Sequence, residues 1–158
     1  QNDGVHRISV SGIDPFDVLC DSKLVGPGWM VIQQGIDGKE DFNKNWVAYR
    51  EGFGSLDGEF FLGLEKIYRL TNSRRHELYL LHGPSTGALK FARYDDFKIS
   101  DESSGYALSL GKFTGNPDML SSSKKMKFST YDRDNDNYSR SCAEMFKNGW
   151  WFNNCGGL

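Results

Sequence analysis

Residues 131–142 read Tyr131-Asp132-Arg133-Asp134-Asn135-Asp136-Asn137-Tyr138-Ser139-Arg140-Ser141-Cys142. Three carboxylates stand at i, i+2 and i+4, and in extended or looped backbone this spacing turns alternate side chains toward one side. Three such like charges repel one another when they are unpaired, whereas a hard cation collects their oxygens. The pattern favours calcium, which accepts several oxygen ligands in irregular geometry. A solvated acidic turn without metal is the alternative that the spacing leaves open.

Two other metal sites fit this stretch poorly. With Asp132 as position 1 of an EF-hand loop, position 6 is Asn137 instead of glycine and position 12 is Ala143 instead of glutamate. Zinc favours histidine or thiolate ligands; no histidine is nearby, and the local thiol of Cys142 is a candidate for a disulfide. The sequon Asn137-Tyr138-Ser139 also lies here. We expect it to be unoccupied, because a glycan would crowd a metal loop.

The chain has three cysteines, Cys20, Cys142 and Cys155. A disulfide between the last two would close a short loop and stabilise the fold by about 3 kcal/mol in the chain-entropy model. Cys20 is then the odd cysteine of this pattern. Two interpretations are open: three reduced thiols in a cytosolic protein, or an extracellular domain whose fourth cysteine lies outside this chain. Between the two C-terminal cysteines, residues 150–152 (Trp-Trp-Phe) are interpreted as buried core, with a ligand platform as the alternative.

Length and composition narrow the class of protein. The 158 residues are enough for one domain with a sizeable core. A formal net charge of −2, without a clustered basic stripe, gives no support for nucleic-acid binding. The longest apolar runs, such as residues 29–32, are too short to span a bilayer. With 18 Gly and 22 aromatic residues (11 Phe, 7 Tyr, 4 Trp), the composition predicts a loop-rich domain in which large rings fix irregular backbone.

Hydrophobic patterning predicts an α+β domain. Strand-like runs lie at residues 5–10, 16–20, 29–33, 77–82, 89–99 and 106–113. Two helices are predicted, one capped by Asn43, running to Tyr49 and ended by Gly52, the other over residues 62–70. From Lys125 onward the chain is polar, aromatic and irregular. Strands and short helices without βαβ alternation are typical of α+β architecture.

No catalytic pattern is found. The three histidines, His6, His76 and His82, form no H-E-x-x-H motif. The run Gly54-Ser55-Leu56-Asp57-Gly58 lacks the G-x-S-x-G order of a nucleophile elbow. Two acids that converge in space for glycoside hydrolysis stay open as an alternative. The obvious acid cluster is better explained by calcium, so we expect no enzyme.

The sequence resembles the fibrinogen C-terminal domain family, which includes fibrinogen chains, ficolins, tachylectins, angiopoietin-like ligands and invertebrate immune lectins. The likeness extends along the whole chain. It rests on Gly28-Trp29-Met30-Val31-Ile32-Gln33, Asp41-Phe42, Trp46, Tyr49, Glu51-Gly52-Phe53-Gly54, Gly58-Glu59-Phe60-Phe61-Leu62-Gly63-Leu64, residues 126–136, Cys142-Ala143-Glu144 and Gly149-Trp150-Trp151-Phe152-Asn153-Asn154-Cys155. The resemblance implies an α+β, fibrinogen C-terminal-like globular domain with a central, mostly antiparallel sheet, short helices and an irregular calcium-binding C-terminal part.

The resemblance also implies domain limits. Residues 1–158 are expected to form a single domain, incomplete at both ends, with subregions at about 1–32, 33–105 and 106–158. The family has an upstream cysteine that pairs with the equivalent of Cys20. Homo-oligomers are expected to form through regions outside this chain.

The resemblance implies a set of metal ligands. Asp134 and Asp136 match the calcium-binding carboxylates of the family, and Tyr138 and Arg140 match positions that supply backbone carbonyls. Asp132 would be an outer-shell acid. Ca²⁺ is the only cofactor expected.

A ligand pocket is implied beside the metal loop. Cys142 and Cys155 match the family's pocket disulfide, and the Asn154–Cys155 peptide matches a non-proline cis bond beside which acetyl groups dock. Phe146 falls at a position of the aromatic funnel. Gly156 replaces a histidine found in many relatives, so one pocket wall differs. The implied ligand-binding residues are therefore Phe146, Asn154, Cys155 and Gly156.

The leading hypothesis for function is a secreted, extracellular, lectin-like module that binds acetylated glycans on cell or microbial surfaces in innate immune recognition. The alternative is a receptor-binding ligand domain of angiopoietin-like type, whose partner is a receptor ectodomain. An adhesion or assembly domain is the third possibility. Neither nucleic acid nor a membrane span is expected.

Overall fold

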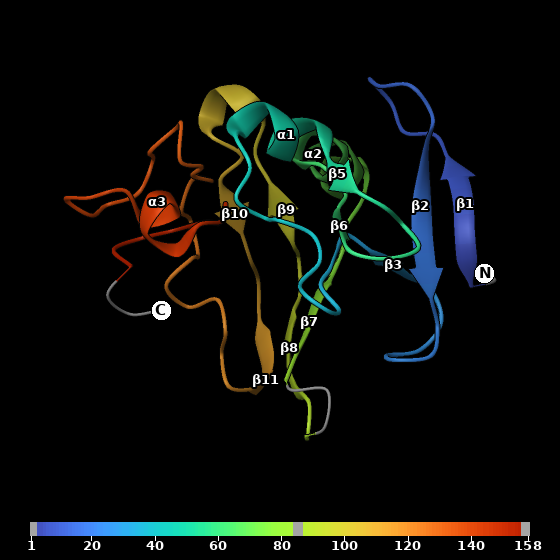
Figure 1. The fold of residues 1–158 in the computed structure, drawn as a ribbon. Coiled ribbons are helices and arrows are strands. Elements are labelled where there is room, and N and C mark those ends of the chain that lie inside the picture. Colours follow the sequence, from blue (N-terminus) through green and yellow to red (C-terminus); the bar gives the residue numbers. More distant parts are fainter. Residues whose placement is uncertain (1–2, 84–86, 156–158) are drawn as a thin grey trace.

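The computed structural model describes residues 3–83 and 87–155 (Figure 1). Its elements follow the chain in the order β1 (Gly4–Ile8), β2 (Phe16–Asp21), β3 (Trp29–Val31), β4 (Gln33–Gln34), α1 (Trp46–Glu51), β5 (Phe53–Gly54), β6 (Phe60–Phe61), α2 (Leu64–Ser73), β7 (Leu78–His82), β8 (Lys90–Tyr94), β9 (Lys98–Ile99), η1 (Glu102–Ser104), β10 (Leu108–Ser109), β11 (Phe113–Asn116) and α3 (Cys142–Phe146). The expected α+β class is confirmed. No helix in the described ranges is long and apolar enough to cross a bilayer.

In the described ranges, the strands form four small antiparallel sheets, with orders β1-β2-β3, β4-β6-β5, β11-β8-β7 and β10-β9. Figure 1 shows β1 and β2 at one side of the molecule, α1 and α2 above the middle strands, and α3 at the other side. The N-terminal strands, the middle elements and α3 thus follow one another across the molecule in sequence order (Figure 1). Within the first sheet, Cys20 lies opposite Gly4 on one side and Met30 on the other.

Both predicted helices are present, with shifted ends. The cap of α1 is Asn45, whose side chain accepts from the Ala48 N–H, whereas Asn43 belongs to the preceding loop. Gly52 ends α1 as predicted. Its φ is +99°, and a Cβ there would lie 2.2 Å from the Leu62 carbonyl oxygen, so only glycine fits.

Two predicted strands are divided in the structure. The run at 89–99 becomes β8 and β9 because the chain turns at Asp96, which has a φ of 48°. The run at 106–113 becomes β10 and the start of β11, with Gly111 between them. The Gly111 N–H donates to the Asp95 carbonyl at 2.7 Å, so the two turns hold each other.

A cluster of aromatic rings joins the irregular C-terminal part to the rest of the core. Phe128 is fully buried, and its ring centroid lies 5.1 Å from that of Tyr49 and 5.1 Å from that of Trp151. Trp151 and Phe152 are also buried, so the core interpretation of the 150–152 run is confirmed for these two residues. The rings therefore fix backbone that has little regular secondary structure of its own.

Glu59 organises the loop at 36–40. Its carboxylate accepts four backbone N–H groups of this loop, those of Ile36, Asp37, Gly38 and Glu40. These hydrogen bonds, led by the one from the Glu40 N–H, lower the pKa of Glu59 from 4.5 to about 2. The folded protein thus stabilises the ionised form of the Glu59 carboxylate.

We expect Glu59→Gln to remove a pH dependence of stability. Because the pKa is lower in the folded state, ionised Glu59 stabilises the fold above about pH 4.5, and this contribution is lost as the pH falls toward about 2. Urea denaturation between these pH values should show a steeper loss of stability for the wild type than for Glu59→Gln. Parallel pH profiles for the two proteins would contradict this role.

Candidate calcium-binding and recognition site

The acidic loop, residues 131–141, is held in place by backbone hydrogen bonds at two positions. Ser129 and Trp150 exchange backbone hydrogen bonds at 2.9 and 3.2 Å, and the Asn137 N–H donates to the Asn153 carbonyl at 2.7 Å. Inside the loop, the Asn135 N–H donates to the Ser129 hydroxyl at 2.9 Å. The backbone of the loop is therefore ordered by contacts within the protein.

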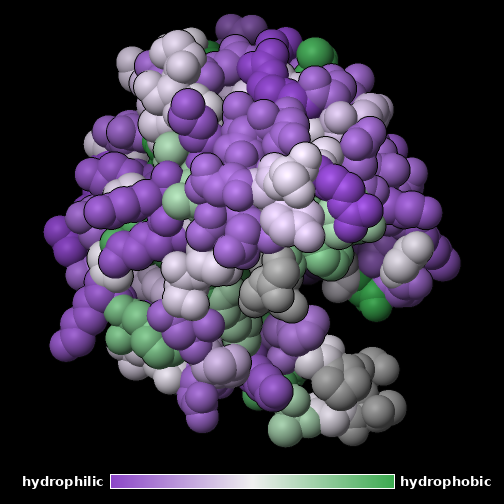
Figure 2. Space-filling model, turned by 90° about the vertical axis from the view of Figure 1, so that its left-hand side faces the viewer, coloured by the Kyte–Doolittle hydropathy of each residue, from purple (hydrophilic) through white to green (hydrophobic). Residues whose placement is uncertain are grey.

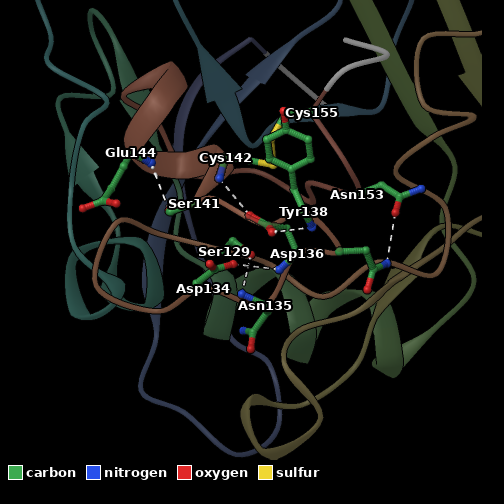
Figure 3. Close-up of a disulfide and its surroundings, with 11 residues drawn as sticks. Ser129, Asp134, Asn135, Asp136, Tyr138, Ser141, Cys142, Glu144, Asn153 and Cys155 are labelled. Atoms are coloured by element: carbon green, nitrogen blue, oxygen red, sulfur yellow. Dashed lines mark hydrogen bonds between the residues drawn. A yellow bond between two sulfur atoms is a disulfide. The ribbon is translucent and has the colours of Figure 1, made fainter.

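Asp134 and Asp136 are neighbours in this loop (Figure 3), since the Asp136 N–H donates to Asp134 Oδ1 at 3.1 Å. The Asp136 carboxylate lies between the loop and α3, where it accepts from the Tyr138 N–H at 3.0 Å and the Cys142 N–H at 2.8 Å. Burial, and then the negative charges of Asp136 and Glu144, raise the pKa of Asp134. Negative charge is therefore crowded at this point, and a bound cation would relieve it.

The donor set suits a hard cation. Each Asp136 oxygen accepts one backbone N–H and keeps a further lone pair. The sulfur atoms of Cys142 and Cys155 also lie near Asp136, but they are bonded to each other and are not thiolate ligands. Oxygen ligands without thiolate or histidine fit calcium and do not fit zinc.

Asp132 has a different role from its two neighbours. Its Oδ1 accepts from the Trp46 N–H, the first of α1, at 2.9 Å and from the Thr130 hydroxyl at 2.7 Å. The guanidinium of Arg133 lies 4.1 Å from the centre of the Trp46 ring. The expectation that three carboxylates turn to one side is therefore wrong for Asp132, because this side chain fastens the loop to a helix 86 residues earlier.

The predicted disulfide is present between Cys142 and Cys155, both buried, with Cα atoms 5.6 Å apart. It joins the first residue of α3 to the end of the described chain. Ser141 caps this helix, since its hydroxyl accepts from the Glu144 N–H at 3.2 Å. The loop, the helix and the bridge thus form one connected unit.

The expected ligand pocket is assembled only in part. Phe146 is 48% exposed, and its ring stacks on Phe152 with centroids 6.0 Å apart. The Asn154–Cys155 peptide is trans, which corrects the expectation of a cis bond. A non-proline cis bond costs about 3–4 kcal/mol and needs contacts to hold it, whereas Asn154 is exposed. The fourth predicted pocket residue, Gly156, lies outside the described residues.

The sequon at Asn137 is engaged within the protein. The Asn137 Nδ2 group donates to Asn153 Oδ1 at 3.0 Å and lies 3.4 Å from the Met126 sulfur. A glycan on this nitrogen would break at least one of these contacts. The sequence had no signal for the Asn137–Asn153 pair, because the two side chains meet only in the folded chain.

Comparison with known proteins places the chain among its relatives. The family model for the C-terminal globular domain of fibrinogen beta and gamma chains matches residues 1–157. The chain belongs to this family. It is 42% identical to human angiopoietin-related protein 2 over 141 residues, which is 89% of this chain and 29% of that protein. It thus spans about a third of the length of this curated relative.

Solved structures agree with the family. The fibrinogen-like globe domain of human ANGPTL6 superposes with a TM-score of 0.92 at 42% identity, over 98% of this chain and 69% of that one. Lamprey fibrin D-dimer, complexed with the peptide ligand Gly-His-Arg-Pro-amide, superposes with a TM-score of 0.88 at 35% identity, over 97% of this chain and 54% of that one. The fold is therefore the fibrinogen-like globe.

We expect Asp132→Ala to destabilise the domain by about 1–3 kcal/mol, because the part-buried Trp46 N–H loses its acceptor. Asp132→Asn keeps an oxygen at the same place and should cost clearly less. Urea denaturation in EDTA measures both variants without any contribution from metal. Equal losses for the two substitutions, or none for Ala, would show that this contact does not hold the loop.

Proposed function

We propose that this chain is the recognition domain of a secreted protein that binds a protein receptor, as the alternative interpretation of the sequence has it, and that it acts by binding and not by catalysis. The observation that carries the proposal is the 42% identity to angiopoietin-related protein 2 over most of the chain. One of the solved structures holds a peptide ligand, so this fold offers a surface to polypeptides.

The surface around α3 supports a protein partner over an acetylated sugar. Figure 2 shows the face of the molecule on the α3 side as largely hydrophilic, with hydrophobic residues in small separate patches. Tyr138, Met145 and Phe146 are 38%, 42% and 48% exposed. Aromatic and methionine side chains within a polar surround are typical of protein interfaces. An acetyl funnel would instead need Phe146 to line a cavity.

The disulfide supports secretion. Disulfides persist in oxidising compartments and are rare in the cytosol, so the Cys142–Cys155 bridge favours an extracellular protein over one with reduced thiols. Angiopoietin-related relatives favour the same interpretation.

We propose further that the acidic loop binds one calcium ion. Asp134 and Asp136 would supply carboxylate oxygens, and Tyr138 and Arg140 backbone carbonyls. Bound calcium would neutralise the crowded charge of the two carboxylates and so stabilise the loop that carries Tyr138. The raised pKa of Asp134 supports this assignment, because burial first, and then the negative charges of Asp136 and Glu144, disfavour an ionised carboxylate without a cation.

Chelation should lower the melting temperature. A ligand at 100 times its Kd stabilises the native state by about 2.7 kcal/mol, which for a domain of this size is a shift of roughly 5–10 °C. Asp134→Asn should abolish the difference between calcium and EDTA. The exposed Asp14→Asn is the matched control and should keep the shift. Identical melting curves in calcium and EDTA for the wild type would leave the solvated acidic turn as the explanation.

Receptor binding is tested with the domain fused to a dimeric carrier, because two linked copies have a higher apparent affinity than one. We expect saturable binding to cells that is lost after trypsin treatment of the cells and kept after enzymatic removal of their N-linked glycans. Free N-acetylglucosamine in excess should not compete. Loss of binding on removal of the N-linked glycans, or competition by N-acetylglucosamine, would contradict the receptor proposal and favour the lectin hypothesis.

A further inference from the structure

A second surface lies on the sheet β11-β8-β7, away from the acidic loop (Figure 1). In this sheet Ala92 and Tyr94 are buried and point to the core. Side chains alternate along a strand, so Phe91 and Arg93 point to the opposite, outer side. We call this side the outer sheet face and define it by Glu77, Tyr79, Phe91, Arg93, Asp95, Lys112 and Thr114.

A shallow pocket of about 300 Å³ lies on this face. Its lining consists of Glu77, Arg93, Asp95, Lys112 and Thr114. All five side chains carry charges or hydroxyls, and none of them belongs to the hydrophobic core or to the acidic loop. A volume of this size is at the lower end of small-molecule sites and suits one sugar ring.

The charges of the pocket leave one cation unpaired. Arg93 binds Glu77 through two hydrogen bonds of 2.8 and 3.1 Å, and Arg75 binds Asp95 at 2.7 and 3.2 Å. These pairs hold the pKa values of both carboxyls below their usual range, so both acids stay ionised and neutralised. Within the described residues, the ammonium of Lys112 has neither a hydrogen bond nor an ion pair. The pocket therefore favours a ligand with one negative charge.

The pocket also has free hydrogen-bonding capacity. Arg93 uses two of its five N–H donors on Glu77, and each Glu77 oxygen keeps a lone pair. The exposed hydroxyl of Thr114 lies opposite Arg93 in the sheet. A ligand rich in hydroxyl groups would find donors and acceptors that ion pairs already hold in place.

An exposed aromatic ring lies beside the pocket. Phe91 stands two residues from Arg93 on the same face of β8, a separation of roughly 7 Å. Its ring is 38% exposed and stacks on Tyr79, with centroids 5.6 Å apart and planes 15° apart. Tyr79 in turn packs edge-to-face against Trp29, with the ring centroids 5.5 Å apart. The ring is thus a rigid, flat, apolar platform roughly 7 Å along the strands from the Arg93–Thr114 pair and roughly 14 Å from Lys112, which lies beside Asp95.

We propose that the outer sheet face binds an acidic saccharide of the uronic-acid class. The carboxylate of one sugar binds Lys112 and Thr114, its hydroxyls bind Arg93 and Glu77, and the apolar face of the next sugar packs on Phe91. This site is separate from the proposed receptor and calcium functions and does not depend on either. A metal ion takes no part in it.

The test uses the full chain in EDTA, with trigalacturonic acid as the probe and neutral galactotriose as its matched control. Titration calorimetry should detect binding of the acid and not of the neutral sugar. Lys112→Ala and Phe91→Ala should each weaken binding by about tenfold or more. Lys124→Ala, an exposed lysine elsewhere, should leave the affinity within about twofold. Circular dichroism checks that each surface variant is folded.

Four results would overturn the proposal: no binding of the acid by the wild type, equal binding of the neutral sugar, equal loss in Lys112→Ala and Lys124→Ala, or unchanged binding in Phe91→Ala. A glutamate-rich peptide that binds this face more tightly than the saccharide would assign it to acidic polypeptides instead. Failure of receptor binding leaves this result untouched, because the two tests use different ligands and different residues.

Discussion

The buried ring of Phe128 is the constraint on which the C-terminal third of the molecule depends. From residue 117 to 155 the described chain has only one short helix, so regular hydrogen bonding does little to order it. Phe128 instead packs against Tyr49 of α1, Phe61 of β6 and Trp151, at centroid distances of 5.1, 6.3 and 5.1 Å. Truncating a buried aromatic residue of this kind costs about 3–5 kcal/mol. The acidic loop begins three residues after Phe128, so the packing of this ring fixes where the loop starts.

On that base, the loop is ordered before any ligand arrives. Asp132 fastens it to α1, Asn137 fastens it to Asn153, and Asp136 fastens it to α3. The hydrogen bonds to neutral amides satisfy the backbone but add no positive charge beside Asp134 and Asp136, and burial, followed by the nearby negative charges, raises the pKa of Asp134. Because the loop already has a fixed shape, binding of the proposed calcium ion would have a small conformational cost.

Much of this could be predicted from local sequence. The spacing of Leu64 and Ile67 predicted α2, and the glycine at 52 predicted the end of α1. The family resemblance supplied the fold and the disulfide pairing. The contact of Asp132 with Trp46 could not be predicted, because it joins residues 86 apart and depends on the packing of Phe128 between them. In the sequence Asp132 was indistinguishable from the two carboxylates that follow it.

Hydrogen exchange of the loop in EDTA is the most direct test that the protein itself orders this site. The account predicts that the amides of Trp46, Asn135, Asn137 and Cys142, each bound to an acceptor, exchange far more slowly than in an unfolded chain even when calcium is removed. Added calcium should slow them further without creating the protection. Exchange of these four amides at unfolded-chain rates in EDTA, with protection only after calcium is added, would contradict the account.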